Sequence, residues 1–162
     1  ALLIREAVQP IGLGARDSLR LEAGLCLYGH ELAPDIDPVQ AGLMWSISKS
    51  RRADGARAGG FPGADIILQR MVNKPPLKRV GLVVEGRRPM RVGQEVFDQQ
   101  SNRVGSICSA AYGSSIGKPI AMAYIERDLG EPGTALQVAV RDMMLSVTVC
   151  SMPFVPQRYF RG

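Results

Sequence analysis

The sequence is poor in the residue types that most often carry metal or nucleophilic chemistry. Its 162 residues include one histidine, three cysteines, one tryptophan, four tyrosines and four phenylalanines. Cys26, Cys108 and Cys150 are far apart and form no Cys-x-x-Cys pair, so the pattern predicts no disulfide framework and favours a reducing compartment. No apolar run approaches the roughly 18 residues that a membrane-spanning helix needs. We therefore expect no membrane association.

What is present describes an ordinary globular protein with a basic excess. Hydrophobic residues make up 46% of the chain and charged residues 22%, with a net charge of +5. A positive balance favours anionic partners. The basic residues cluster at 49–52, 78–79 and 87–91, but no aromatic side chains interleave with them as single-stranded nucleic acid would require. This pattern favours a solvated basic face over nucleic-acid binding.

Two helices are predicted from apolar spacing. Residues 12–29 carry an apolar stripe at helical spacing, and Gly29 is the expected stop because glycine readily adopts the left-handed conformation that ends many helices. A short helix is expected at 63–71, after a glycine-rich loop at 53–62.

A further helix is predicted from its starting signals. Asp37 is a good N-cap, Pro38 suits the first helical position, and Gln40 stands three residues after the cap, which completes a capping box. The apolar pattern predicts that this helix continues to Arg52.

From residue 76 onward the pattern changes to short apolar stretches separated by turn residues. The predicted strands are 79–84, 104–107, 120–124, 136–140 and 145–149. Several short strands with polar turns indicate an antiparallel barrel or sandwich. The fold class is therefore α+β, with helices first and a β module after them.

Two motifs imitate catalytic sites without meeting their requirements. Residues 113–117 read Gly-Ser-Ser-Ile-Gly, the pattern of a serine hydrolase nucleophile elbow, but a strand follows instead of a helix and the single His30 precedes the serine. Cys26 and His30 are four residues apart, yet a metal site needs further ligands nearby. We predict no metal site and no complete catalytic group within these residues.

One long stretch resembles a known family. Residues 12–29 read GLGARDSLRLEAGLCLYG, which closely resembles the signature helix of the aminomethyltransferase of the glycine cleavage system, the T-protein. The resemblance continues at residues 38–45, 61–64, 79–82 and 152–156. It covers essentially the whole chain but only the C-terminal part of a family chain. We therefore expect the N-terminal half of the protein to lie outside these residues.

The resemblance implies an activity and an architecture. Family members take the aminomethyl group from the lipoyl arm of the H-protein, release ammonia and pass the one-carbon unit to tetrahydrofolate. Folate lies between three lobes arranged as a cloverleaf. On that plan residues 1–33 end the first lobe, 34–75 belong to the second lobe and a linker, and 76–162 form the C-terminal antiparallel β-barrel.

Four residues match folate-binding positions of the family: Arg16, Trp45, Arg79 and Tyr159. Their chemistry suits folate, because guanidinium groups recognise carboxylates and aromatic rings offer flat faces with polar tips. Each also has an ordinary structural interpretation. Arg16 can pair with a carboxylate such as Glu22, Trp45 can belong to the core, and the other two can be a strand-end charge and a tail aromatic.

The functional carboxylates of the family have no counterpart here. An aspartate near the reacting folate nitrogen and a glutamate that binds the pterin belong to upstream segments, so we expect no catalytic residue in this chain and no activity from it alone. The alternative is a non-catalytic binding or interaction module that keeps the same scaffold. The resemblance favours the mitochondrial matrix as location, with a bacterial cytoplasm as the alternative.

Overall fold

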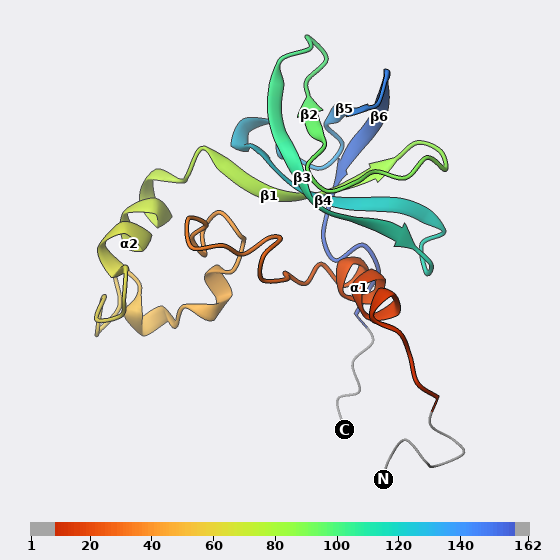
Figure 1. Cartoon of the computed structure of the whole chain (residues 1–162). Coiled ribbons are helices and arrows are strands. Elements are labelled where there is room, and N and C mark those ends of the chain that lie inside the picture. The colour runs from red at the N-terminus through yellow and green to blue at the C-terminus, as the bar shows by residue number, and fades with distance from the viewer. Residues whose placement is uncertain (1–8, 158–162) are drawn as a thin grey trace.

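The computed structural model describes residues 9–157. Its regular elements are helices α1 (Leu13–Glu22) and α2 (Ala64–Asn73), three single-turn 3₁₀ helices (Met44–Ser46, Lys49–Arg51 and Arg127–Leu129), and strands β1 (Leu77–Val84), β2 (Glu95–Phe97), β3 (Arg103–Gly113), β4 (Lys118–Glu126), β5 (Ala135–Val140) and β6 (Met143–Cys150). Figure 1 shows the strands gathered in one body, with α1 against it and α2 set apart from it.

The strands close into a barrel in the order β1-β4-β3-β2-β5-β6, and β6 returns to pair with β1. Every pairing is antiparallel. This confirms the α+β class and decides for the barrel over the sandwich. The five predicted strands are all present. The sequence pattern missed β2, because a three-residue strand with one buried side chain, Val96, is too short to show a period of two.

Alternating side chains fill the barrel. Its core holds fifteen buried residues, among them Val80, Leu82, Val96 and Val138. Strand β4 departs from alternation, since five consecutive residues from Pro119 to Ala123 are buried. Its outward side chains lie under α1, where Leu21, Ile120 and Met122 form a second buried cluster. A strand covered on both faces has a continuous apolar run, which is what β4 shows.

Helix α1 is shorter than predicted. It ends at Glu22, not near Gly29, because Gly24 adopts a left-handed φ of 68°. The amide of Leu25 donates to the Arg20 carbonyl and that of Gly24 to the Leu21 carbonyl, both at 2.9 Å, which is the Schellman pattern of helix ends. Of the two glycines that can stop this helix, the earlier one does so.

The helix predicted over residues 37–52 is wrong in length but right in its start. Asp37 Oδ1 accepts hydrogen bonds from the amides of Val39 and Gln40, and Gln40 Oε1 lies 3.4 Å from the Asp37 amide. The capping box therefore forms. After a single turn, Gly42 takes a left-handed φ of 71°. Two 3₁₀ turns follow where further helix was expected.

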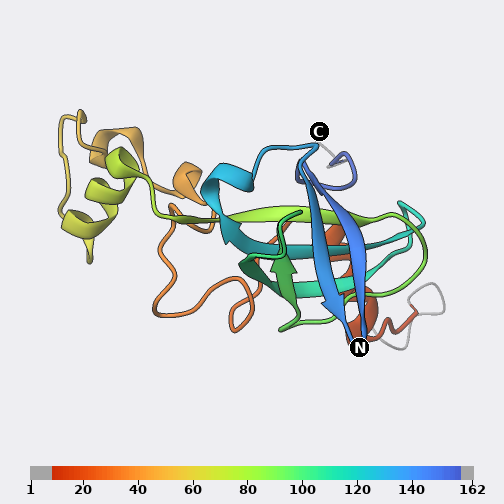
Figure 2. The ribbon, with the colours of Figure 1, turned by 90° about the horizontal axis from the view of Figure 1, so that it is seen from above.

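Helix α2 confirms the short helix predicted at 63–71, and it has no buried residue. Arg70 on α2 forms an ion pair with Asp37 and donates to Gln40 Oε1 at 3.1 Å. Figures 1 and 2 both show α2 and the 3₁₀ turns beyond one end of the barrel. No helix within residues 9–157 has the length and apolarity to cross a membrane.

Candidate functional site

A buried arginine joins α1 to the barrel. The Arg20 side chain is 7% exposed, and all three of its nitrogens donate hydrogen bonds. Nη1 reaches Glu31 Oε2 at 2.8 Å, Nη2 reaches Ser109 Oγ at 2.7 Å, and Nε reaches Asp17 Oδ1 at 2.7 Å. Helix, loop and strand β3 are thereby fixed to one guanidinium group. Its rigid fork suits such a role better than a lysine ammonium does.

Glu31 is the acidic partner in this network and is 0% exposed. Its Oε2 also accepts from the Leu27 amide at 3.0 Å, and its backbone carbonyl accepts from the Tyr124 hydroxyl at 2.8 Å. Its other oxygen, Oε1, is buried without a hydrogen-bond partner among the described residues. Sequence reasoning missed Glu31, because it lies in a loop and its partners are distant along the chain.

The serine motif at residues 113–117 lies in the hairpin between β3 and β4. Ser115 Oγ donates to Glu22 Oε2 and the Ser115 amide donates to Glu22 Oε1, both at 2.7 Å. His30 Nδ1 instead lies 3.1 Å from the Cys108 carbonyl oxygen. The segment joins two strands, as the sequence predicted, and does not form the strand–turn–helix of a nucleophile elbow. The serine attaches the hairpin to α1.

Burial favours the protonated form of the three thiols. Burial raises the pKa of Cys108, whose Sγ lies 3.2 Å from the Met122 carbonyl oxygen, and it raises the pKa of Cys26. Burial also raises the pKa of Cys150 to about 11. Reactive cysteines have a lowered pKa, so these three residues are structural. Within residues 9–157 no three His, Cys, Asp or Glu side chains gather where they can hold a metal ion.

Arg79 makes a third connection between the barrel and the segments before it, after those made by Arg20 and by Ser115 with Glu22. Its Nε donates to the Ala41 carbonyl and its Nη1 to the Gly24 carbonyl, both at 2.9 Å, and Nη1 also contacts Met122 Sδ. The Arg79 amide donates to the Gln40 carbonyl at 3.0 Å. Arg79 is therefore more than a charge at a strand end, since it connects the end of α1, the turn before Gly42 and the barrel.

Trp45 and Arg79 line one cavity of about 250 Å³. The side chain of Trp45 is 77% exposed, so it is not a core residue. The cavity is completed by Ala23, Gly24, Leu25, Cys26, Leu43, Met152, Pro153 and Gln157. A cavity lined by an exposed indole and by a guanidinium group has the chemistry to take a flat heterocycle with oxygen acceptors.

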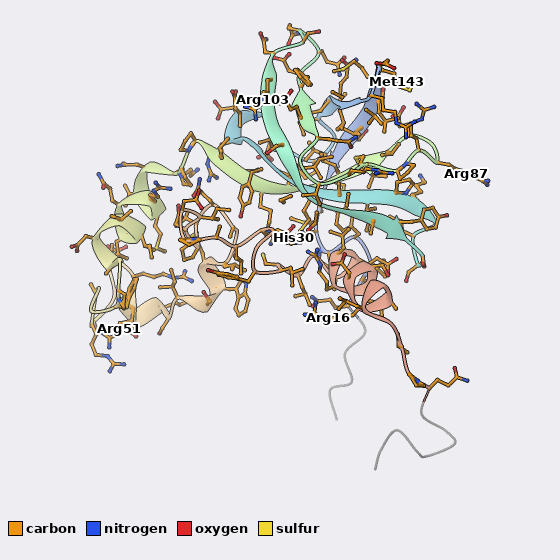
Figure 3. All side chains as sticks on the ribbon, viewed as in Figure 1. Arg16, His30, Arg51, Arg87, Arg103 and Met143 are labelled. Atoms are coloured by element: carbon orange, nitrogen blue, oxygen red, sulfur yellow. The ribbon has the colours of Figure 1, made fainter. Side chains whose placement is uncertain are left out.

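Arg16 lies elsewhere. It is exposed and lines a second cavity of about 470 Å³ with Leu13, Gly14, Asp17, Leu27 and His30. Figure 3 shows Arg16 on α1 and His30 between α1 and the barrel. Glu22, a carboxylate that could have paired with Arg16, bonds to Ser115 instead. Tyr159 lies outside the described residues. Of the four predicted folate contacts, the structure brings two together.

Comparisons with known proteins agree with this architecture. Residues 78–156 match the glycine cleavage T-protein C-terminal barrel domain, and residues 5–51 match the GCVT N-terminal domain. A mitochondrial aminomethyltransferase of Flaveria trinervia is 44% identical over 154 residues, which are 95% of this chain and 37% of that protein. The mitochondrial aminomethyltransferase of Dictyostelium discoideum is 45% identical over 159 residues, covering 96% and 38%.

A solved structure gives the same result. The glycine cleavage system aminomethyltransferase T from Bartonella henselae superposes with a TM-score of 0.91 at 41% identity, over 99% of this chain and 43% of that one. The chain thus spans about 37% of the length of the first of these relatives. Barrel topology, matched domains and sequence identity agree, and the chain belongs to the aminomethyltransferase family of glycine cleavage T-proteins.

Proposed function

We propose that this chain is part of an aminomethyltransferase of glycine cleavage. The reaction moves the one-carbon unit from the aminomethyl-lipoyl arm of the H-protein to tetrahydrofolate and releases ammonia. The observation that carries the proposal is the shared cavity of Trp45 and Arg79, at the point where α1, the turn at Gly42 and the barrel meet. Tetrahydrofolate supplies the nitrogen atoms that accept the one-carbon unit.

The residues of this chain would bind and orient folate. The indole of Trp45 would stack on an aromatic ring of the ligand. The hydrogen bonds that Arg79 makes among the described residues use Nε and Nη1, which leaves Nη2 as its donor toward a ligand oxygen. Arg16, which lines a different cavity, and Tyr159 would contact other parts of the ligand. All four roles are proposals that rest on the family resemblance.

Proton transfer at the amine and at the folate nitrogen needs a positioned acid or base. The cavity of Trp45 and Arg79 has no acidic lining residue. We propose that the required carboxylates come from outside these 162 residues, and that the division into parts at 1–33, 34–75 and 76–162 reflects three folate-binding lobes. The 162-residue chain with lipoylated H-protein and tetrahydrofolate should then form no methylenetetrahydrofolate above background.

The H-protein and folate are the proposed partners, and the mitochondrial matrix is the proposed location. The location rests on the relatives from Flaveria trinervia and Dictyostelium discoideum, which are mitochondrial aminomethyltransferases. The Bartonella henselae relative keeps the bacterial cytoplasm as an alternative. Fractionation of the source cells, followed by detection of the chain, decides between the two.

Calorimetric titration of the complete protein with tetrahydrofolate tests the binding roles of these four residues. Trp45→Ala is the cleanest variant, because an exposed side chain contributes little to folding. We expect it to weaken binding about tenfold, and Arg16→Lys and Tyr159→Ala to weaken it by about tenfold to a hundredfold. Tyr112→Ala, another exposed aromatic on β3, and Arg57→Lys in the exposed loop are matched controls. Equal affinities for Trp45→Ala and Tyr112→Ala would contradict the assignment.

A further inference from the structure

Arginines gather at an end of the barrel that the proposed folate site does not use. Arg87, Arg88 and Arg91 belong to the loop between β1 and β2, and Arg141 lies in the two-residue turn between β5 and β6. These two segments are about fifty residues apart in sequence and meet because β6 pairs with both β1 and β5. Figure 3 shows Arg87 at the tip of its loop and Met143 at the end of the neighbouring hairpin.

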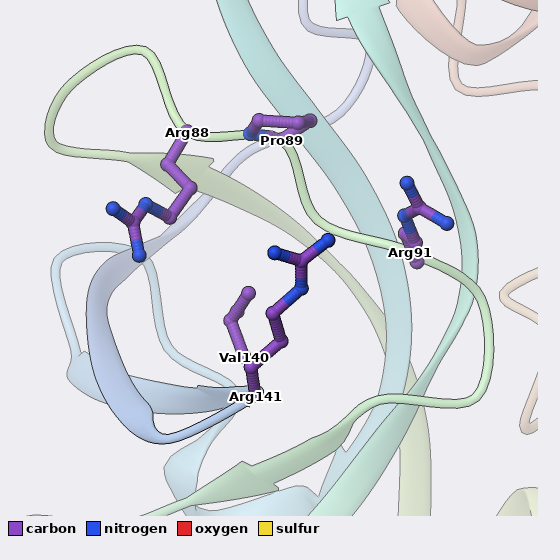
Figure 4. Close-up of a pocket in the computed structure, with 5 residues that line it drawn as sticks. All are labelled: Arg88, Pro89, Arg91, Val140 and Arg141. Atoms are coloured by element: carbon purple, nitrogen blue, oxygen red, sulfur yellow. The ribbon is translucent and has the colours of Figure 1, made fainter.

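Three of these arginines line one cavity of about 310 Å³, together with Pro89 and Val140. Figure 4 shows Arg141 extending between Arg88 and Arg91. No acidic side chain lines the cavity, and no ion pair found among residues 9–157 includes any of the three arginines. Like charges brought together repel one another, so a bound anion would relieve the repulsion.

Two local contacts involve the segments that carry the arginines. The Arg88 guanidinium group contacts Met143 Sδ, and the Arg91 amide donates to Gln94 Oε1 at 2.7 Å. The guanidinium groups themselves belong to three exposed residues that line the cavity. The fork of each group matches the oxygen spacing of phosphate and carboxylate.

The backbone at Arg141 is strained in a way that favours a role for its side chain. Arg141 has a φ of 54°, in the left-handed region where glycine and asparagine are at home. A long side chain at the first position of a two-residue hairpin turn costs free energy that glycine would avoid. Strain of this kind is found where a side chain is needed at one place.

We propose that the cavity formed by Arg88, Arg91 and Arg141 binds a small polyvalent oxyanion, either a di- or triphosphate group or a polycarboxylate. The apolar lining is limited to Pro89 and Val140. It offers no aromatic platform for a nucleic-acid base and no extended apolar floor for a lipid chain. The site is separate from the cavity of Trp45 and Arg79, so it stands whether or not the proposed function holds.

Titration of the 162-residue chain with pyrophosphate and with citrate, at matched ionic strength, tests the proposal and distinguishes the two ligand sources. We expect at least one of them to bind, and Arg88→Gln and Arg91→Gln each to weaken its binding by about tenfold or more. Arg57→Gln removes the same charge from an exposed loop elsewhere and should change the affinity by less than about twofold.

Arg141→Gly separates a binding role from a structural one. It should raise the melting temperature or leave it unchanged, because glycine accepts the left-handed backbone, while it weakens anion binding about tenfold. The proposal is wrong if neither anion binds more tightly than chloride, or if Arg57→Gln weakens binding as much as the cavity variants do. Binding of hexaglutamate without binding of either small anion would also overturn it and would identify a protein-docking surface.

Discussion

The barrel and the segment before it are held together by different forces. The barrel has a closed hydrogen-bonded sheet and fifteen buried residues in its core. In the segment from residue 9 to residue 75 the buried apolar residues are Leu21, Val39, Ala41 and Pro75, and α2 has none. Apolar burial is therefore the dominant force in the barrel. The preceding segment packs on the barrel through one small apolar cluster around Leu21, and hydrogen bonds from a few charged side chains supply its other attachments.

This difference matters because the attachments build the candidate folate cavity. Arg79 bonds to the end of α1 and to the turn before Gly42, and Trp45 follows that turn directly. Arg20 and Glu22 fix α1 on the barrel. A site made by polar junctions is sensitive to single substitutions that would have little effect on the barrel itself.

The largest effect is expected at the buried ion pair. Arg20→Met leaves the Glu31 carboxylate buried without its cation, which costs about 3–5 kcal/mol. Thermal unfolding followed by circular dichroism measures the loss. Arg16→Met, one helical turn away and exposed, is the control and should change the stability by less than about 0.5 kcal/mol. Similar effects of the two substitutions would show that the pair is not what attaches α1.

Removing apolar side chains should destabilise the barrel much more than the segment before it. Leu82→Ala opens a cavity in the barrel core and is expected to cost about 2–5 kcal/mol. Ile66 on α2 is 59% exposed, so Ile66→Ala should cost less than about 0.5 kcal/mol. Urea denaturation of both variants gives the comparison. A large loss for Ile66→Ala would mean that α2 contributes to a core.

The hairpin attachment should give a smaller loss. Ser115→Ala removes one charge-assisted hydrogen bond to Glu22 and is expected to cost about 1.5–3 kcal/mol, at the lower end because the Ser115 amide still donates. Ser114→Ala, on the same hairpin and exposed, is the control. An unchanged melting temperature for Ser115→Ala would mean that the backbone bond alone holds the hairpin.

The smallest effect is expected at alkaline pH. Burial raises the pKa of Cys150 from 9.0 to about 11, so the unfolded chain loses this proton before the native chain does. The native state then binds more protons than the unfolded state between pH 9 and about 11, and stability falls as the pH rises through that window. Cys150→Ala should flatten the fall in melting temperature. If the melting temperature of Cys150→Ala falls as steeply as that of the unchanged chain, other groups cause the pH dependence.

Local sequence signals predicted the elements better than their ends. Short apolar stretches between turn residues gave five of the six strands, and the capping box at Asp37 formed as expected. Local rules could not rank Gly24 against Gly29 as the stop of α1, because either glycine can adopt the left-handed conformation. The choice is made by packing, since the chain must turn at Gly24 to bury Glu31 beside Arg20.

The site was predictable only in part. The family resemblance predicted Trp45 and Arg79 as folate contacts, and the structure places both at one cavity. Their contact with folate stays a prediction. The resemblance gave no indication of Glu31, whose contacts with Arg20 and Tyr124 join positions far apart in the sequence. The spacing of apolar residues carries no information about such polar contacts. The sequence around a loop carboxylate looks the same whether that carboxylate is solvated or buried.

Hydrogen exchange measured across residues 9–157 tests most directly whether polar junctions hold α1 on the barrel. In the unchanged chain, the amides of α1 and of β4 should exchange slowly and those of α2 quickly. In Arg20→Met, the protection of α1 should fall by about a hundredfold or more while that of β1 and β4 persists. If α1 keeps its protection in that variant, or if the barrel loses protection together with α1, the account of two differently stabilised regions is wrong.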